Sequence, residues 1–528
     1  MKNNFKIYSF TILSLLLIVQ NSVQSQSGSL DQSFSGDGKL TSMIGSGDDR
    51  AFGLTTQANG KIIVVGSTVN GSQSDFAIVR YNSDGTPDNS FSGDGKLVID
   101  FNGGDDEARS VIVLNNGNIL ISGSASIGNS YDFALVMITA DGRLQTSFSG
   151  DGKLNIDFNK LDDFCYSMQV FNNKIYLGGQ TLGAQGEEFA IAVINMDGSP
   201  DLGFDADGKA NYNIGPSPDF GTAIAVQTDG KIVLTGYTGS DFLDQIATIR
   251  CLENGMLDVS FSGDGKIITD IGPDRDRAYA VAIQKDQKII VAGYTYHQSG
   301  NDFALVRYLM DGSLDKSFSN DGIVVQGIGT RFDEASAMVL QEDGKILVAG
   351  QAAQPATDAD FGLARFTESG VLDKEFSGDG VVITPIGNGK SEDESFAIAI
   401  QPDGKIVIAG EAENGTNLDF AVARYHSGLT VGTFAESLNI DRLELYPNPT
   451  TQHFNLGFTL TKEQTLTIAL CNHFGQALYT FTNQYSFSAS RHHLYYQLPE
   501  SINSGIYFLH IQSKQKSIKV LPLFVRKH

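Results

Sequence analysis

One feature limits what this chain can fold into more than any other: a hexapeptide that returns at a nearly constant spacing. The motif Ser-Phe-Ser-Gly-Asp-Gly and its variants place a phenylalanine at seven positions. These are Phe34, Phe91, Phe148, Phe204, Phe261, Phe318 and Phe376, which are separated by 57, 57, 56, 57, 57 and 58 residues. Counted from Leu30, seven units fill residues 30–428. A fixed period of this size indicates a solenoid, a propeller or an array.

Each unit contains four short segments with strand-like patterns. In the first unit, residues 39–44, 50–57 and 76–81 alternate apolar and polar side chains, whereas residues 61–65 are a continuous aliphatic run. Alternation is typical of a half-buried strand, and a continuous run of a strand buried on both faces. Asn59-Gly60 and its Asp-Gly equivalents predict type I′ turns between the second and third strands. We therefore predict an all-β fold, a seven-bladed β-propeller of four-stranded antiparallel blades, with an open β-solenoid as the alternative.

A glycine ends the aliphatic segment in every unit. Its positions are Gly66, Gly123, Gly179, Gly236, Gly293, Gly350 and Gly410. Because only glycine lets two backbones approach very closely, this position is predicted to lie in a crowded part of the fold.

The units resemble the delta-60 repeat family, which is also catalogued as a β-propeller domain of unknown function. The shared pattern runs through Leu-Asp-x-x-Phe, Gly-Asp-Gly-Lys, Gln-x-Asp-Gly-Lys-Ile-Val-x-Ala-Gly and Asp-Phe-Ala-x-x-Arg-Tyr, and is clearest at residues 257–266 and 401–410. The third unit departs most, with Gln145, Asn173 and Val193 at motif positions. The resemblance covers about three quarters of the chain and implies a propeller, without an established chemistry.

Composition changes after residues 429–442, which are predicted to be a linker. Residues 443–528 resemble the type A sorting domain of type IX secretion through Tyr-Pro-Asn-Pro, Asn-x-x-Gly-Gln and Ser-Gly-Ile-Tyr-Phe. The sorting-motif residues are Tyr446, Pro447, Asn448, Pro449, Gly475, Gly505 and Tyr507. The resemblance implies a small C-terminal β-sandwich that the type IX secretion machinery exports across the outer membrane, with the cargo released or attached to the cell surface. Pro522 departs from the usual finish, and an ordinary binding module is the alternative.

The first 25 residues are predicted to be a secretory signal peptide. Lys2 and Lys6 precede an apolar run at residues 10–19, which is too short to span a bilayer, and cleavage is expected between Ser25 and Gln26. An uncleaved anchor helix is the alternative. No other segment reaches 18 consecutive apolar residues, so the mature chain is expected to have no transmembrane segment. The protein is therefore expected to be secreted, either extracellular or attached to the outer-membrane surface.

Charge and cysteine content exclude two classes of protein. The formal net charge of −24 argues against a nucleic-acid partner, because phosphate binding needs clustered Lys and Arg. Three cysteines in 528 residues cannot form a disulfide framework, so buried free thiols are expected.

Groups that could carry catalysis are scarce in the repeats. His297 and His426 are the only histidines between residues 30 and 428, and a Ser-His-Asp triad or a zinc site needs convergent ligands. Carboxylates are abundant, and the weak candidates for metal ligands are Asp48, Asp49, Asp105, Asp106, Asp162, Asp163, Asp205 and Asp207. Such oxygens could hold Ca²⁺ or serve glycoside hydrolysis. Turn chemistry is the competing explanation, and no cofactor is firmly predicted.

Two functions follow from these observations. The first is a non-catalytic binding or scaffold propeller for an extracellular glycan or protein ligand. The second is a Ca²⁺-dependent hydrolase of the propeller type that uses the loop carboxylates. The segments that break the repeat are residues 180–188, 235–245 and 351–360, with an aromatic cluster at Tyr294, Tyr296 and His297. They are predicted to be loops, where binding residues concentrate.

Overall fold

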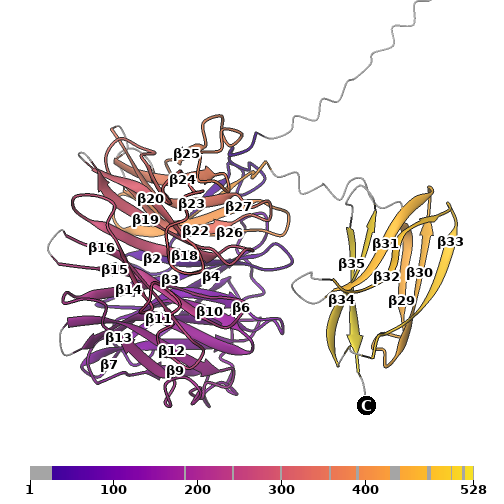
Figure 1. Cartoon of the computed structure of the whole chain (residues 1–528), viewed down its shortest axis with the longest axis horizontal. Coiled ribbons are helices and arrows are strands. Elements are labelled where there is room, and N and C mark those ends of the chain that lie inside the picture. The colour runs from indigo at the N-terminus through magenta and orange to yellow at the C-terminus, as the bar shows by residue number, and fades with distance from the viewer. Residues whose placement is uncertain are drawn as a thin grey trace, which may run out of the picture. The chain divides into compact units, whose positions relative to one another are not determined.

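The protein is described from a computed structural model. It describes residues 26–183, 186–240, 243–297, 300–355, 358–387, 392–428, 440–471, 477–500, 502, 504–513 and 518–526. The signal peptide, most of the expected linker and Gly475 lie outside the described residues. The chain splits into two compact units, one built on the repeats and one on the C-terminal residues, and they are treated separately below (Figure 1).

The repeats form seven four-stranded antiparallel sheets within the described ranges, and six of these sheets consist of consecutive strands. The strands of the six sheets are β2 (Asp49–Thr56), β3 (Ile62–Asn70), β4 (Gln73–Tyr81) and β5 (Lys96–Ile99); β6 (Asp106–Val113), β7 (Ile119–Ile127), β8 (Ser130–Ile138) and β9 (Lys153–Ile156); β10 (Asp163–Phe171), β11 (Lys174–Gly183), β12 (Gly186–Asn195) and β13 (Lys209–Tyr212); β14 (Asp219–Val226), β15 (Ile232–Thr238), β16 (Gln245–Cys251) and β17 (Lys266–Thr269); β18 (Asp276–Ile283), β19 (Ile289–His297), β20 (Gly300–Tyr308) and β21 (Ile323–Gln326); and β22 (Asp333–Leu340), β23 (Ile346–Gln354), β24 (Asp358–Phe366) and β25 (Val381–Thr384). The all-β propeller fold expected from the repeats is thereby confirmed.

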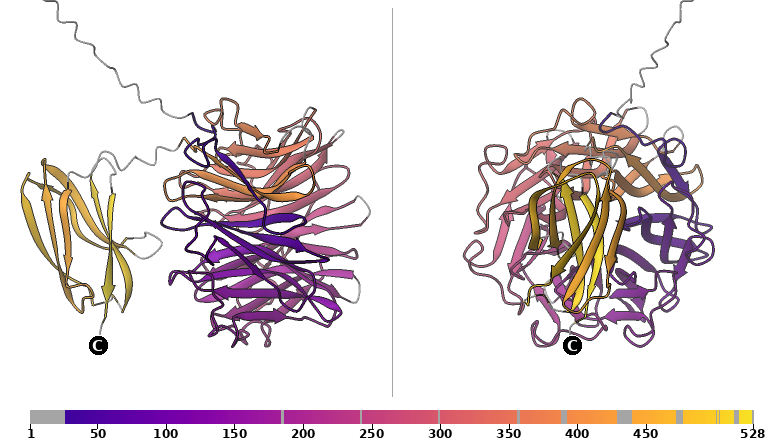
Figure 2. Two further views of the ribbon diagram at one scale, coloured as in Figure 1. Left: turned by 180° about the vertical axis from the view of Figure 1, so that it is seen from behind. Right: turned by 90° about the vertical axis from the view of Figure 1, so that its right-hand side faces the viewer.

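The seventh sheet shows how the ring closes. Its strand order is β1-β28-β27-β26, with β1 (Lys39–Ser42), β26 (Asp393–Ile400), β27 (Ile406–Glu413) and β28 (Leu418–Tyr425). The first strand of the repeats therefore completes the last sheet. Figure 2 shows the sheets arranged around a central axis.

The sheets do not coincide with the sequence units, which corrects the grouping of strands read from the repeat. The first segment of each unit is the outer strand of the preceding sheet: β5 pairs with β4, and β1 pairs with β28. The chain crosses to the next sheet only after that strand. The first strands of neighbouring sheets contact one another, as β14 contacts both β10 and β18. The first strand of each sheet is therefore the one nearest the axis.

The repeated Phe and Leu-Asp motifs contribute to a buried group of contacting side chains at one end of most sheets. In the sheet of β16, Arg250 donates from Nε to Asp258 at 2.8 Å, Asp258 accepts from the Ser260 hydroxyl at 2.7 Å, and the guanidinium lies 4.5 Å from the centre of the Phe261 ring. Arg250 and Asp258 are both buried. The same arrangement uses Arg80, Arg307, Arg365 and Arg424. Met137 and Val193 occupy the arginine position in the second and third sheets.

The repeated glycines lie opposite a β-bulge. A Cβ at Gly236 would overlap the backbone oxygen of Phe220, and the other six glycines meet the equivalent oxygen. In the same place the register of β14 and β15 shifts between Gly221 and Ala223, which leaves Thr222 as the extra residue. The crowding expected at this position is confirmed, and its cause is the bulge on the strand nearest the axis.

The predicted turn type was wrong for the Asn-Gly turns. Of Asn59 and Gly60, only the glycine has a positive φ, of 81°, and its N–H donates to the Gln57 carbonyl at 2.8 Å. This is a type I turn followed by a left-handed glycine. In the third unit, both Asn172 and Asn173 have positive φ, as a type I′ turn requires.

The C-terminal unit contains two antiparallel sheets around one core. Their orders are β29-β30-β33 and β32-β31-β34-β35. The strands are β29 (Ile440–Tyr446), β30 (His453–Leu460), β31 (Gln464–Cys471), β32 (Ala477–Phe487), β33 (Arg491–Gln497), β34 (Gly505–Ser513) and β35 (Ile518–Val525). Buried residues of both sheets, such as Phe454, Leu456, Leu466 and Leu509, form a single hydrophobic cluster, as in a β-sandwich.

The sorting-motif residues lie at the ends of these strands. Tyr446 ends β29, Gly505 begins β34, and Tyr507 pairs with Leu523 of β35. Asn448 accepts a hydrogen bond from the backbone N–H of Phe524 at 2.8 Å, which ties the Tyr-Pro-Asn-Pro segment to β35. Across the described part of the chain, no helix has the length and apolar character needed to cross a membrane.

Candidate functional site

One aspartate at the start of the first strand recurs in all seven sheets and has a structural role. The set, called here the junction aspartates, is Asp49, Asp106, Asp163, Asp219, Asp276, Asp333 and Asp393. Each is buried and accepts a backbone N–H from the loop before it, such as that of Phe101 on Asp106 at 2.7 Å. A structural role therefore accounts for Asp49, Asp106 and Asp163 in the pairs Asp48-Asp49, Asp105-Asp106 and Asp162-Asp163, although each bond runs to the loop before the aspartate and not to the residues after it.

The other acid of each pair ties the loop to the preceding sheet. Asp48 accepts the N–H of Leu418 at 3.1 Å, Asp105 that of Ser74 at 2.9 Å, and Asp162 that of Tyr131 at 3.0 Å. Asp205 and Asp207 lie in the connection between β12 and β13, where Asp207 accepts the N–H of Lys209 at 3.0 Å. Within the described residues, these last two are not among the acids that the fold gathers into clusters.

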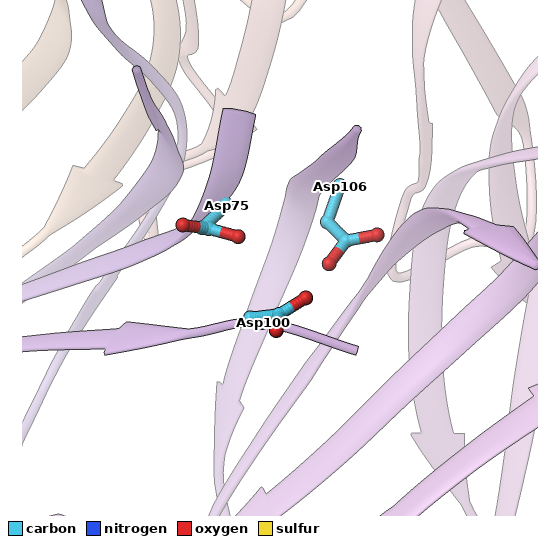
Figure 3. A group of neighbouring side chains, drawn as sticks. All are labelled: Asp75, Asp100 and Asp106. Atoms are coloured by element: carbon cyan, nitrogen blue, oxygen red, sulfur yellow. The ribbon is translucent and has the colours of Figure 1, made fainter. Parts of the chain in front are cut away.

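Two of the junction aspartates belong to clusters of three carboxylates. Asp106 lies with Asp75 and Asp100, and one oxygen of each lies within 4.8 Å of the others (Figure 3). Asp163 lies with Asp132 and Asp157 in the same way. Asp75 belongs to β4, Asp100 follows β5 and Asp106 begins β6, so each trio spans the junction of two sheets. Carboxylate oxygens at such spacing are the ligand type that Ca²⁺ takes.

Burial and mutual repulsion favour the protonated form of these acids. Burial is the main cause that raises the pKa of Asp106 to about 6; the charges of Asp100 and Asp75 act in the same direction, and the hydrogen bonds it accepts oppose the shift. Burial likewise raises the pKa of Asp163 to about 6. The equivalent positions elsewhere hold other residues, such as Met43, Asn213, Gly327 and Pro385 in place of Asp100. The full trio is thus found at two of the seven junctions.

A second group of side chains surrounds the propeller axis in two rings. The first axial ring consists of the residues that follow the junction aspartates: Arg50, Glu107, Phe164, Phe220, Arg277, Glu334 and Glu394. The second axial ring consists of the bulge residues and their equivalents: Phe52, Arg109, Tyr166, Thr222, Tyr279, Ser336 and Phe396. A bulge bends its strand and re-aims a side chain, so the repeated glycines indirectly position the second ring.

One half of these rings is aromatic. Phe220 stacks on its cross-strand neighbour Tyr237 with 4.7 Å between ring centres, and Tyr237 lies 6.3 Å from Tyr279. Tyr279 stacks on Tyr294 at 5.9 Å. Side chains from two consecutive sheets thus form one aromatic surface, within which the Arg277 guanidinium lies 4.6 Å from the centre of the Tyr237 ring. In the sheet before them, the ring of Tyr166 stacks on that of Phe164 with 6.5 Å between ring centres.

The opposite half is charged. Arg50 lies 3.6 Å from Glu411 of β27, and the guanidinium of Arg109 lies 3.8 Å from the centre of the Phe52 ring. A cavity of about 720 Å³ nearby is lined by Glu334, Glu394 and the loops beside them. Burial raises the pKa of Glu334 and Glu394 above the ordinary value. The axial rings therefore combine an apolar aromatic face with paired acids and bases.

Glu411 predicts a pH dependence of stability. Burial raises its pKa to about 7, with Arg50 opposing the shift. Between about pH 4 and pH 7 the folded protein therefore keeps a proton on Glu411 that the unfolded chain loses. The contribution of this proton to the free energy of unfolding is full below about pH 4 and is lost as the pH rises through about 7. Glu411→Gln should leave stability unchanged at pH 4.5 and raise it at pH 8 by on the order of 2 kcal/mol.

Urea unfolding at both pH values measures this difference. Glu413→Gln, an exposed neighbour on the same strand, is the matched control and should change neither value. An equal effect of Glu411→Gln at the two pH values would contradict the assignment.

The thiols do not contribute to a reactive site. All three cysteines are free and buried, as expected from the sequence. Burial raises the pKa of Cys165 and of Cys251 to about 12, so neither carries a thiolate at neutral pH.

Comparison with known families decides what the two units are. Residues 57–91, 114–148, 172–204, 284–318, 341–376 and 401–431 match the family described as "Domain of unknown function (DUF5122) beta-propeller". Residues 444–521 match the "Secretion system C-terminal sorting domain". The chain contains DUF5122 β-propeller repeats followed by a C-terminal sorting domain. That sorting domain marks the propeller as cargo of the type IX secretion machinery, destined for secretion and attachment to the cell surface.

The propeller is also similar, at low identity, to several solved structures. A PL25 ulvan lyase bound to -[GlcA(1-4)Rha3S]- is 12% identical over 72% of this chain and 95% of that chain, with a TM-score of 0.38. The polysaccharide lyase Uly1 is 8% identical over 78% and 94%, with a TM-score of 0.42. The Trypanosoma rangeli sialidase in complex with sialic acid is 10% identical over 94% and 90%, with a TM-score of 0.35. The comparison with curated proteins gave no match.

Sequence reasoning located parts of both groups. It named Asp106 and Asp163 but missed Asp75, Asp100, Asp132 and Asp157, which recur at fixed distances from them. Among the axial residues it found Tyr294 and the segment containing Tyr237. It missed Arg50, Arg109, Arg277 and Glu411. A signal for Arg50 and Arg277 was present in the sequence, because the residue after each junction aspartate is arginine, glutamate or phenylalanine depending on the repeat.

Proposed function

We propose that this exported propeller is a non-catalytic binding module whose ligand is a glycan held at the axial rings. One observation supports the proposal: residues that hold the sheets together are the same in every repeat, whereas residues at the axis differ from repeat to repeat. The junction aspartate and the glycine opposite the bulge are the same in all seven sheets, whereas the first axial ring contains arginine, glutamate and phenylalanine. The aspartate and the glycine are repeated because every sheet needs them to fold. The first axial ring has no such requirement, and its variation is what binding of a ligand without sevenfold symmetry would produce.

The chemistry of the rings suits a sugar. Aromatic side chains present apolar faces on which the C–H faces of a sugar ring can stack. Tyr237 and Tyr279 are half-buried members of this aromatic surface, in which Phe220 stacks on Tyr237 and the Arg277 guanidinium lies 4.6 Å from the Tyr237 ring centre. The charged half supplies hydrogen-bond donors and acceptors that fix the orientation of a bound ring.

Titration of the purified protein with laminarin, yeast mannan and alginate tests the proposal. At least one polysaccharide should bind without release of reducing ends. Tyr237→Leu keeps an apolar side chain but removes the aromatic face, and it should weaken binding by about tenfold. Met310→Leu changes an exposed side chain at the other end of its sheet and should leave binding unchanged.

Two results would count against this function. One is binding of none of the three polysaccharides. The other is turnover of any of them that disappears when one loop carboxylate is replaced.

Calcium binding is the second candidate, and the two carboxylate trios favour it. A bound Ca²⁺ would compensate the mutual repulsion of the three carboxylates in each trio. Adding Ca²⁺ at pH 7 should then raise the Tm of the protein, and a chelator should reverse the change. Asp75→Asn should reduce this response, whereas Asp207→Asn should not. A Tm that neither Ca²⁺ nor chelator alters would remove the candidate, and with it the calcium-dependent hydrolase.

A further inference from the structure

The repeat is longer between two of its junction aspartates than between any other successive pair. The spacings are 57, 57, 56, 57 and 57 residues, and then 60 residues from Asp333 to Asp393. One additional residue lies in the hairpin between β23 and β24, because Gly350 and Arg365 are 15 residues apart where the equivalent pair in the first unit is 14 apart. The other two lie before β26, because Asp393 accepts the N–H of Ile386, seven residues earlier, where the equivalent bonds span five residues.

Both longer loops adjoin the cavity of about 720 Å³ that contains Glu334 and Glu394. Its lining includes Gln354 at the end of β23, Asp358 at the start of β24, and Glu392 just before β26. The lining thus includes part of residues 351–360, one of the segments that break the repeat. The other sheets fold without these additional residues, and loops that depart from a scaffold are where binding residues concentrate. The cavity is therefore the place where the chain departs from its framework around an accessible space.

The lining of this cavity carries an excess of negative charge. Its described residues include one guanidinium, that of Arg331, and four carboxylates, those of Glu334, Asp358, Glu392 and Glu394. Glu334 and Glu394 are half-buried, and neither forms an ion pair with a described residue. Withdrawing a carboxylate from water without a cation beside it costs free energy. A positively charged ligand would supply that cation.

The arrangement suits an organic cation better than a metal ion. Among the described residues, groups of three or more acids with oxygens within 4.8 Å of one another are the trios of Asp106 and Asp163, at other junctions. The acids of the cavity form no such group. Phe332, which also lines the cavity, is 49% exposed and presents an apolar ring on which the C–H face of a sugar can stack.

We infer that this space, called here the acidic cavity, binds the protonated amino group of an amino sugar. The inference rests on the proposed function and names the class of glycan. An ammonium group donates hydrogen bonds and accepts none, so it complements carboxylates, which accept and do not donate. The net charge of −24 attracts a cationic polysaccharide to the protein and repels a polyuronate such as alginate.

Binding of the purified full-length protein to oligosaccharides of glucosamine and of N-acetylglucosamine, equal in length and linkage, tests the inference. At about pH 6 the free amine is protonated, whereas the acetylated sugar carries no charge. The glucosamine oligosaccharide should bind at least about tenfold more tightly than the acetylated one, and more tightly than laminarin, mannan or alginate.

Three variants of the acidic cavity locate the binding. Glu334→Gln and Glu394→Gln should each weaken binding of the glucosamine oligosaccharide by about tenfold, as expected for a bond to a charged group. Glu392→Gln changes an exposed side chain and should weaken it by about twofold to fivefold. None of the three should alter binding of the acetylated oligosaccharide. Because Glu392 is exposed, its variant provides the test independently of how the half-buried variants fold.

Glu342→Gln is the matched control, since it removes the same charge from the exposed turn at the other end of β22. It should bind the glucosamine oligosaccharide like the unchanged protein. If it weakens binding as much as the cavity variants do, the net charge alone attracts the ligand, and the acidic cavity is overturned. Full-strength binding by all three cavity variants overturns it as well.

The remaining outcomes separate this inference from the proposal on which it rests. Equal binding of the two oligosaccharides overturns the amino-sugar class and leaves a glycan-binding function intact. The same conclusion follows if laminarin or mannan binds and the glucosamine oligosaccharide does not. Failure of the unchanged protein to bind any of these sugars overturns both the inference and the proposed function.

Discussion

A chain that lacks residues 443–528 is expected to remain in the periplasm, with none reaching the cell surface or the medium. The removed part contains the whole sorting domain, including the Tyr-Pro-Asn-Pro segment that Asn448 ties to β35. The propeller sheets are complete without it, because β1 closes the last sheet with β28. The truncation should therefore abolish export while leaving a folded β-rich propeller. Cell fractionation with immunoblotting measures the location, and circular dichroism of the periplasmic protein measures the fold.

A matched control separates loss of sorting from general damage. Asp37→Ala changes an exposed turn residue of the propeller, which accepts the N–H of Lys39, and it should be exported normally. Surface display of the truncated chain at the normal level would refute the role of the tail. An unfolded periplasmic product would show instead that the propeller depends on its C-terminal unit.

The framework of the propeller could be predicted from the sequence because its positions repeat for steric reasons. Seven buried phenylalanines and seven glycines that end the aliphatic segments repeat with one period, which a repeated sheet satisfies. The assignment of strands to sheets could not be predicted in the same way. A sequence unit has no marked beginning, so whether β5 pairs with β4 or begins the next sheet depends on where the chain crosses over.

The candidate site was harder to predict because its members come from different sheets. Asp75, Asp100 and Asp106 are separated in sequence by up to 31 residues, and only the junction of two sheets brings them together. The axial rings were hard to predict for another reason, because their residues do not recur from one repeat to the next. Arg109 and Glu411 differ from their equivalents in the other units, and only the ring closure brings their sheets, the second and the seventh, to either side of the first.

The ring closure itself predicts a large loss of stability in Asp31→Ala. Asp31 and Arg424 are both buried, and Arg424 donates from Nε to Asp31 at 2.8 Å. The replacement leaves the guanidinium buried beside Phe34 without its carboxylate. Breaking one partner of a buried ion pair costs about 3–5 kcal/mol, and urea unfolding at pH 7 measures it. Asp37→Ala, which is exposed, should cost less than about 1 kcal/mol.

Comparison with Asp258→Ala shows why Asp31 matters beyond its pair. Asp258 and Arg250 make the same contact within one sheet and are eight residues apart, whereas Asp31 and Arg424 join segments separated by 393 residues. Both variants should lose a similar free energy of unfolding. Only Asp31→Ala should also release the segment that carries β1, because noncovalent contacts alone hold β1 in the last sheet, whereas β17 follows β16 along the chain. Limited proteolysis should then cut Asp31→Ala before β2 and leave Asp258→Ala intact there. Equal cleavage of the two variants, or a loss below about 1 kcal/mol in Asp31→Ala, would mean that strand pairing alone closes the ring.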